Sequence, residues 1–427
     1  MRAFVGVCAA ALAAAQSTML FNQSEANAIY DGVGVSLHGS SPLAATFAVG
    51  SSLNPPEFIE VFGADGTLAW QYMPTSGAAY LVSSARHVDG ASSNAVDTFS
   101  AEVTAGGATL LGFSSTGTGT PAWSTSLPNC SSDGGGGTYN GLQASDDGAS
   151  LAFLCHATTA IAFLVDGQSG AIKWKLDLGP DVKVGQGSIE ITNTGTFVLF
   201  VNEQGVPTPN TAEAFIIDAS TGVLRGNITI PFFIDAAVSD SGDYVVVGDN
   251  AVAHVWLWSA SAGAYAPAYD LTPPAGPRGW IPWDIVMSTG SDATEMIILG
   301  CIAGDVLSVQ VSAFALVGGA LLTNWVSPVN TKLQENPTLR ADAEYIGVSL
   351  WGDSGEVGYP TVVLLKAGSN TPLFSYVTPG SMFAVDLAVS SAAGTDTVLI
   401  TAAGKAVPAN QFGNGGNAFA WSVVVPS

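Results

Sequence analysis

The chain has 427 residues, 48% of them hydrophobic, and its 34 acidic residues outnumber 11 basic ones to leave a net charge of −23. A surface of that sign repels phosphate backbones and anionic lipids, which excludes nucleic acid as a partner. The length would allow two or three ordinary domains, and no segment after the N-terminus has the roughly 20 uninterrupted apolar residues of a membrane-spanning helix.

The N-terminus has the pattern of a secretory signal peptide. Residues 1–16 carry Arg2 near the start, an apolar run that ends at Ala15, and Ala13 and Ala15 as an A-x-A cleavage site. We therefore expect residues 1–16 to be removed and the protein to be secreted, with a lumenal or periplasmic location as the alternative. A membrane anchor is the competing interpretation, but the apolar run is too short to cross a bilayer.

One unit recurs about every 51 residues along the rest of the chain, which is the signature of a repeat architecture. Each copy has a turn, usually containing glycine, followed by an apolar strand, and in several copies Trp stands four residues after the glycine. The turn positions are Gly66, Gly119, Gly170, Gly222, Gly263, Gly319 and Thr371.

The copy at 232–271 shows what each unit contains. Four short runs rich in Val, Ala and aromatic residues (FIDAAVS, YVVVGD, AVAHVWLW and AYAPAYDL) are divided by turn compositions such as DSGD. Four antiparallel strands per repeat form one blade of a β-propeller. Strands in such blades are buried on both faces, which accounts for the high apolar content.

The ends of the chain predict eight blades. Residues 380–427 supply only three strands, and STMLFNQ at 17–23 aligns with GTLAWQY at 66–72, with Phe21 in the place of Trp70. Residues 17–27 would then be the outer strand of the last blade, so that pairing of the N- and C-terminal strands closes the ring. Seven blades with a decorated edge are the alternative. Residues 17–427 are thus expected to form a single all-β propeller domain with blades at 30–74, 79–128, 137–178, 183–231, 232–272, 279–328, 336–379 and 380–427.

The repeats resemble those of the quinoprotein-like (pyrroloquinoline-quinone-type) propellers, whose blades end in a D-x-x-T-G-x-x-x-W pattern. LVDGQSGAIKWKLDL is similar to it, IIDASTGVLRGNI matches through Asp218, Thr221 and Gly222 without the Trp, and VFGADGTLAWQY keeps Gly66 and Trp70. The resemblance implies the architecture and leaves the activity open, because this superfamily contains dehydrogenases, assembly factors and binding proteins. The quinone-dependent dehydrogenases often carry adjacent cysteines, which this chain lacks.

Cysteines and sequons suggest covalent features of a secreted protein. Cys130 and Cys155 could form a disulfide, and the alternative is that they and Cys301 are separate buried thiols. Asn22, Asn129 and Asn227 stand in N-glycosylation sequons. No spacing of Cys and His resembles a zinc site, so no metal site is predicted.

A binding face is predicted where the long connections gather. In a propeller, the connections between the second and third strands and between successive blades emerge on one face, and here they include 129–138, 204–212, 273–280, 351–360 and 404–417. On this loop-rich face, scarce cations stand beside aromatic residues, as in many binding surfaces. The candidates are Arg278, Trp280, Trp283, Arg340, Trp351 and Tyr359. Alternatively, Trp280 and Trp283 simply pack the first strand of their blade and the arginines neutralise local acid.

We therefore expect an exported, monomeric binding or scaffold module whose partner is a protein, peptide or glycan. No catalytic residues are identified and no cofactor is predicted, although calcium or a quinone would be the first to consider. The alternative function is a secreted quinoprotein-like oxidoreductase, or a hydrolase, that uses the central channel.

Overall fold

The computed structural model describes residues 15–25, 29–53, 58–74, 79–88, 95–104, 107–128, 130, 141–156, 160–178, 184–202, 212–230, 234–249, 251–274, 279–303, 308–328, 336–351, 359–392, 394–405 and 415–426. Within these ranges, almost all regular structure is β-strand, and the one helical segment is the 3-10 turn η1 (Pro42–Ala44). None of the described residues form a helix of the length and apolarity that a membrane crossing requires.

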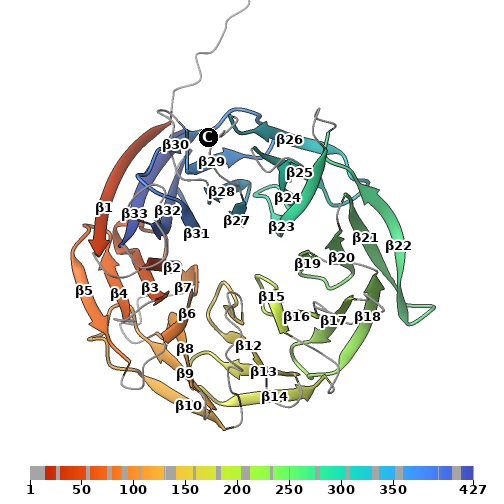
Figure 1. Ribbon diagram of the computed structural model, residues 1–427, viewed down its shortest axis with the longest axis horizontal. Helices are drawn as coiled ribbons and strands as arrows, with labels where there is room; N and C mark the ends of the chain where they lie inside the picture. Colours follow the sequence, from red (N-terminus) through yellow and green to blue (C-terminus); the bar gives the residue numbers. More distant parts are fainter. Residues whose placement is uncertain are drawn as a thin grey trace, which may run out of the picture.

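Eight antiparallel sheets are arranged in a ring around a central axis (Figure 1), which confirms the predicted eight-bladed β-propeller. The strands of each blade are given from the innermost to the outermost. Blade 1 contains β2 (Ile29–His38), β3 (Thr46–Leu53), β4 (Phe58–Gly63) and β5 (Leu68–Tyr72), and blade 2 contains β6 (Ala79–Ser84), β8 (Thr98–Thr104), β9 (Gly107–Phe113) and β10 (Trp123–Pro128). Blade 3 contains β11 (Leu142–Ala144), β12 (Ser150–His156), β13 (Ala160–Asp166) and β14 (Ile172–Asp177), and blade 4 contains β15 (Val184–Ile191), β16 (Phe197–Asn202), β17 (Ala212–Asp218) and β18 (Leu224–Ile230).

The second half of the ring follows the same order. Blade 5 contains β19 (Ala236–Val238), β20 (Tyr244–Gly248), β21 (Ala253–Ser259) and β22 (Ala264–Leu271), and blade 6 contains β23 (Trp280–Thr289), β24 (Glu295–Ala303), β25 (Val309–Ala315) and β26 (Leu321–Val326). Blade 7 contains β27 (Pro337–Asp342), β28 (Tyr345–Leu350), β29 (Val362–Lys366) and β30 (Phe374–Tyr376), and blade 8 contains β31 (Met382–Ala392), β32 (Thr395–Lys405), β33 (Gly416–Pro426) and β1 (Gln16–Glu25). We call the end of the ring where first strands lead into second strands the tight-turn face, and the opposite end the loop face.

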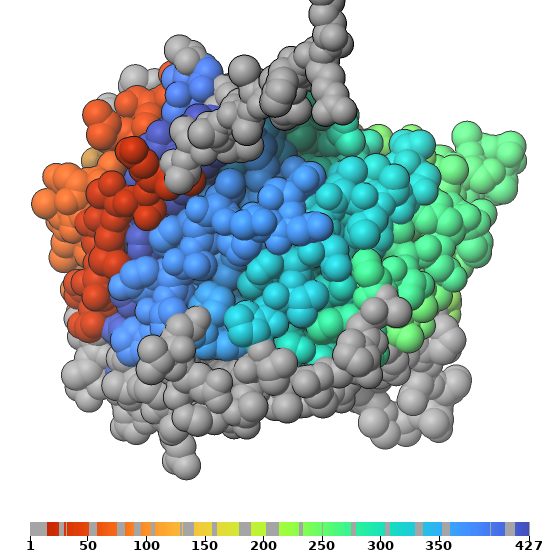
Figure 2. All heavy atoms as spheres, turned by 90° about the horizontal axis from the view of Figure 1, so that it is seen from above, coloured from red at the N-terminus to blue at the C-terminus, as the bar shows by residue number. Residues whose placement is uncertain are grey.

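The N-terminal strand closes the ring, as the alignment of STMLFNQ predicts. β1 pairs antiparallel with β33 from Gln16 opposite Val424 to Glu25 opposite Gly416. In Figure 2 this red N-terminal segment lies beside the blue C-terminal part of the chain. Phe21 is buried and stacks on Phe62 of blade 1 with ring centroids 4.6 Å apart, so β1 joins blade 8 to blade 1.

Burial within the blades follows the position of each strand. Middle strands such as β24 and β28 are buried along nearly their whole length, because neighbouring blades cover both faces. Outer strands such as β14 have exposed and partly exposed residues in alternation, since one face meets solvent. The core is therefore a circular series of hydrophobic layers between adjacent blades, and each layer is made by two blades.

The repeated glycine and tryptophan form a contact between neighbouring blades. Trp174 on the outer strand of blade 3 lies against the turn of blade 4, where its indole N–H donates to the Ala219 carbonyl at 2.7 Å. Gly222 in that turn has a positive φ of 69°, and a Cβ added there would lie 2.7 Å from Trp174 Cγ. Trp123 and Gly170 repeat this arrangement between blades 2 and 3. The sequence pattern therefore reflects packing between blades as well as turn geometry.

This contact predicts a graded response to alanine at two turn glycines. Gly222→Ala should lower the free energy of unfolding by about 3 kcal/mol, because it combines a left-handed backbone with a clash against Trp174. Gly263 has a φ of 61° but nothing within 4 Å of an added Cβ, so Gly263→Ala should lose only about 1 kcal/mol. Urea unfolding of both variants checks the difference. Equal losses would show that Trp174 does not restrict this position.

The cysteines occupy two environments. Cys130 and Cys155 form a disulfide with a Cα–Cα distance of 5.3 Å, which ties the start of blade 3 to its second strand. Cys301 on β24 is a buried free thiol in the layer between blades 5 and 6. Burial raises the pKa of the Cys301 thiol above its ordinary value, which disfavours the reactive thiolate.

Candidate functional site

The predicted loop-face residues divide into core and partly exposed side chains. Trp280 is 9% exposed and packs between blades 5 and 6, and Tyr359 is 3% exposed and packs between blades 6 and 7. These two side chains belong to the core, which corrects their assignment to a surface. Trp280 is the first residue of β23 and Tyr359 precedes β29, and the neighbouring blade covers both side chains. Arg278 and the sequon residue Asn129 lie outside the described residues.

Trp351 is part of an aromatic group at the loop face that sequence reasoning found only in part. It follows β28, is partly exposed, and packs edge to face on Phe383 of β31 with centroids 5.1 Å apart. The Lys405 ammonium lies 5.8 Å from the Phe383 ring centroid. We call Trp351, Phe383 and Lys405 the Trp351 patch; it spans blades 7 and 8. Aligning the first strands of the blades could have found Phe383, because it stands one position after the start of β31, as Ile281 does in β23.

The remaining candidates are scattered around the ring. Trp283 is partly exposed at a register shift in β23, and Arg340 is partly exposed on β27 with its guanidinium donating to the Leu339 carbonyl at 3.1 Å. Asn22 on β1 and Asn227 on β18 are exposed on outer strands, where a glycan could be carried without disturbing the core.

Polar side chains line the central channel in a second repeat that the sequence reading missed. On the innermost strand of one blade, an oxygen accepts a backbone N–H from the innermost strand of the next blade at 2.6 to 3.2 Å. The acceptor and donor residues are Ser83 and Ala144, Gln143 and Ile191, Asp235 and Ile285, Asp284 and Leu339, Asp342 and Val389, and Asp386 and Val35. These oxygens satisfy N–H groups that the inner edge of each sheet would leave unpaired. The acidic members recur at nearly the blade spacing, which was the available signal.

Three of the channel carboxyls interact with one another. Burial raises the pKa of Asp235 and Asp284, and the charge of Asp284 raises the pKa of Asp235 further. Burial also raises the pKa of Glu190 well above its usual range, and Arg340 only partly offsets this. Burial thus shifts these channel carboxyls toward the protonated form, a property shared by catalytic and structural sites.

A segment of blade 2 crosses the tight-turn end of the channel. After β6, residues His87–Val88 form the short strand β7, which pairs in parallel with β2 of blade 1 (Figure 1). The buried Arg86 guanidinium lies 3.3 Å from Asp146 of blade 3 and 3.3 Å from Asp386 of blade 8, and donates to the Ala341 carbonyl of blade 7 at 2.9 Å. One side chain of blade 2 thus contacts blades 3, 7 and 8 around the channel.

The carboxylates around Arg86 are committed to that contact. His87 adds an ion pair to Asp342 at 2.9 Å, and this hydrogen bond raises the pKa of His87. Burial raises the pKa of Asp146 to about 6, although the Arg86 charge acts in the opposite direction. Acidic groups at this end of the channel therefore hold the crossing segment in place.

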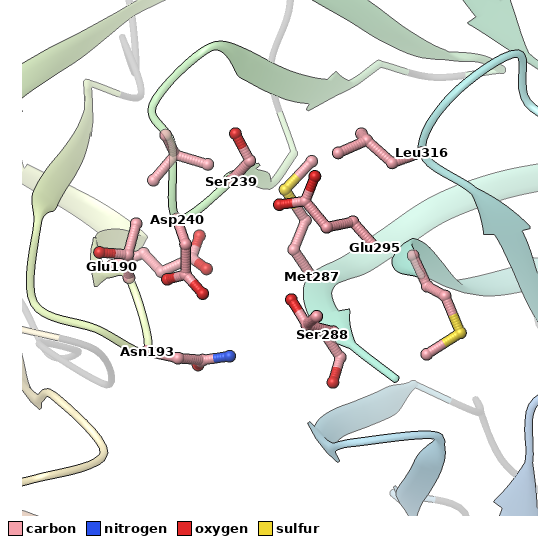
Figure 3. Close-up of a pocket in the computed structure, with 12 residues that line it drawn as sticks. Glu190, Asn193, Ser239, Asp240, Met287, Ser288, Glu295 and Leu316 are labelled. Carbon is pink, nitrogen blue, oxygen red and sulfur yellow. The ribbon is translucent and has the colours of Figure 1, made fainter. Parts of the chain in front are cut away.

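A pocket opens on the tight-turn face where blades 4, 5 and 6 meet (Figure 3). Its volume, counted together with the space open to solvent, is about 300 Å³. Figure 3 shows the Glu190 and Asp240 side chains on one wall and Glu295 on the opposite wall. No group of three or more His, Cys, Asp or Glu among the described residues is arranged to hold a metal ion.

These features define the class of protein as an eight-bladed β-propeller in which a segment of blade 2 crosses one end of the central channel. No protein-family model matches the chain, and no curated protein matches its sequence. Among solved structures, the Dos1 propeller is similar with a TM-score of 0.55 and 12% identity over 94% of each chain. This similarity supports the fold alone.

Two further structures are more distant. BamB from Moraxella catarrhalis has a TM-score of 0.46 and 14% identity, covering 95% of this chain and 97% of its own. The quinohemoprotein alcohol dehydrogenase ADHIIG from Pseudomonas putida HK5 has a TM-score of 0.48 and 11% identity, covering 95% of this chain and 76% of its own.

Proposed function

We propose that this chain is an exported propeller that acts as a binding or scaffold module through its loop face. The observation that carries the proposal is the Trp351 patch, where two aromatic rings and a cation from two blades meet at one mouth of the ring. Aromatic side chains beside a cation on a rigid scaffold are typical of sites that bind proteins, peptides or glycans. The Trp351 indole N–H supports the proposal, because it is buried and no described group accepts its hydrogen bond.

The channel carboxyls favour this module over an enzyme that works in the channel. Asp235 and Asp284 each accept a backbone N–H from the next blade, at 2.6 and 2.7 Å, and Asp146 and Asp386 flank Arg86. Such groups have a structural use in holding the ring together. The faces of the ring then remain as the surfaces for a partner.

The test is comparative capture from the medium of the source cells. Immobilised protein should retain a specific partner, and the double variant Trp351→Ala, Lys405→Ala should retain at least about tenfold less of it, since central aromatic and charged contacts dominate binding. Lys173→Ala on the outer strand of blade 3 is the matched control and should retain as much as the unmodified protein. A glycan array with the same three proteins covers carbohydrate ligands. Equal retention by all three proteins would contradict the assignment to the loop face.

A further inference from the structure

The pocket between blades 4, 5 and 6 has an uncompensated negative charge. Glu190, Asp240 and Glu295 contribute carboxylates, and none of the residues that line it is Lys, Arg or His. The charge of Asp240 raises the pKa of both Glu190 and Glu295, in addition to the effect of their burial, so the three groups share one electrostatic environment. Arg340 on β27 of blade 7 is a cation whose charge lowers the pKa of Glu190.

The carboxyl group of Glu190 has one buried oxygen that receives no hydrogen bond from any described residue. One side of its carboxyl accepts the Val238 backbone N–H, as in the channel repeat, while Oε2 is buried and no described group donates to it. A buried oxygen of this kind costs free energy unless a ligand supplies the missing hydrogen bond. One carboxylate oxygen of Asp240, Oδ1, already accepts hydrogen bonds: the Thr194 backbone N–H donates to it at 3.2 Å and the Thr194 hydroxyl at 3.1 Å.

The rest of the lining suits an aliphatic chain that ends in a charge. Met287 and Leu316 lie on the same side of the pocket as Glu295, opposite Glu190 and Asp240 (Figure 3). Met296, Ser239 and Ser288 also line the pocket. Methionine side chains adapt to ligands of irregular shape. Lys and Arg side chains combine an apolar stem with a charged end, and the pocket has both apolar and acidic lining residues.

We propose that this pocket binds an organic cation, an ammonium or guanidinium group on an aliphatic stem, as presented by a Lys or Arg side chain of a protein partner. The site lies on the tight-turn face, opposite the Trp351 patch, and goes beyond the proposed function at the loop face. A cation seated here would donate hydrogen bonds to Glu190 Oε2 and Glu295 and would neutralise their shared charge.

Binding should be coupled to the release of a proton. Burial raises the pKa of Glu190 and so favours its protonated form in the empty pocket, whereas a bound cation favours the ionised form. Asp240, Asp284 and Arg340 also face Glu190, and their combined charge remains negative. The affinity is therefore expected to rise with pH in the range where Glu190 titrates, and the heat of binding should depend on the ionisation heat of the buffer.

The experiment is calorimetric titration of the full-length mature protein with three short probes. These are the capped peptides Ac-Gly-Lys-Gly-amide and Ac-Gly-norleucine-Gly-amide, which differ by the charged end, and 1,5-diaminopentane. The Lys peptide should bind at least tenfold more tightly than the norleucine peptide. Glu295→Gln and, separately, Glu190→Gln should each weaken the Lys peptide about tenfold while thermal unfolding shows a folded protein.

The control is Asp147→Asn, which removes one exposed charge from the equivalent turn of blade 3 on the same face and leaves the pocket unchanged. Its affinity for the Lys peptide should stay within twofold of the unmodified protein. A similar loss in this control and in Glu295→Gln would overturn the proposal, because the cation would then be held only by the general charge of −23. No binding of the Lys peptide or diaminopentane at 10 mM, on the order of the weakest interaction that matters at a single site, would overturn it as well. Tighter binding of diaminopentane than of the peptide would assign the site to a free amine, and the reverse to a partner's side chain.

Discussion

Removal of residues 15–25 should leave a protein that cannot fold to a stable ring. β1 covers β33, most of whose residues are buried, and inserts Phe21 against Phe47 and Phe62 of blade 1. Without it, blade 8 has three strands, a full ladder of backbone groups is unpaired, and the apolar face between blades 8 and 1 is open. The loss is expected to exceed about 5 kcal/mol, which is comparable to the total stability of many domains. Soluble yield, circular dichroism and size-exclusion chromatography measure the outcome.

A circular permutant separates the role of the strand from its place in the chain. Gln16 lies opposite Val424, so a short turn can join the end of β33 to the start of β1 as a hairpin. A chain that begins at residue 29 and carries residues 15–25 after residue 426 should fold with nearly the unmodified stability. Folding of the deletion variant without added β1 would show that closure does not depend on this pairing.

Arg86→Met should destabilise the ring by about 3 to 5 kcal/mol. The substitution keeps much of the side-chain volume but leaves Asp146 and Asp386 without their cation and the Ala341 carbonyl without its donor. Removing one partner of a buried ion pair is costly because the remaining charge stays in a poorly solvated place. Urea unfolding at neutral pH measures the change, and the unfolding midpoint should fall accordingly.

Two comparisons identify the cause of that loss. Lys173→Met breaks an exposed ion pair with Asp166, 3.6 Å apart, and should cost no more than about 1 kcal/mol. Adding Asp146→Asn to Arg86→Met should recover part of the stability, because it removes one of the unpaired charges. If Arg86→Met costs as little as Lys173→Met, the crossing segment does not brace the ring.

Much of the fold could be predicted because its signals are local and repeated. The turn glycines take positive φ values in the structure, as at Gly170 and Gly222, and the copy at 232–271 has its four strands where the apolar runs and turn compositions place them. Even the long-range closure had a local signal, since Phe21 stands where the repeat has Trp. Its packing on blade 1 confirms that alignment.

The candidate site was harder to predict, for a physical reason that Trp280 and Trp351 show. Both are Trp residues at the loop ends of their strands, yet Trp280 lies within the layer between blades and Trp351 lies at the mouth against Phe383. Sequence position along a strand does not say how far the neighbouring blade covers it. The partner of Trp351 comes from the next blade, which no local pattern specifies.

The sequence by itself determined the repeat, the strand count of each blade and the closure by the N-terminal strand, because alternation, turn residues and their spacing act within one blade or between neighbours. Only the tertiary structure decided the contact of Arg86 with Asp386, 300 positions away, the shared charge of Glu190 and Glu295, and the meeting of Trp351 with Phe383. These contacts depend on the curvature of the whole ring, which brings the inner strands of distant blades around one channel. Side-chain chemistry between such strands therefore appears only once the ring is closed.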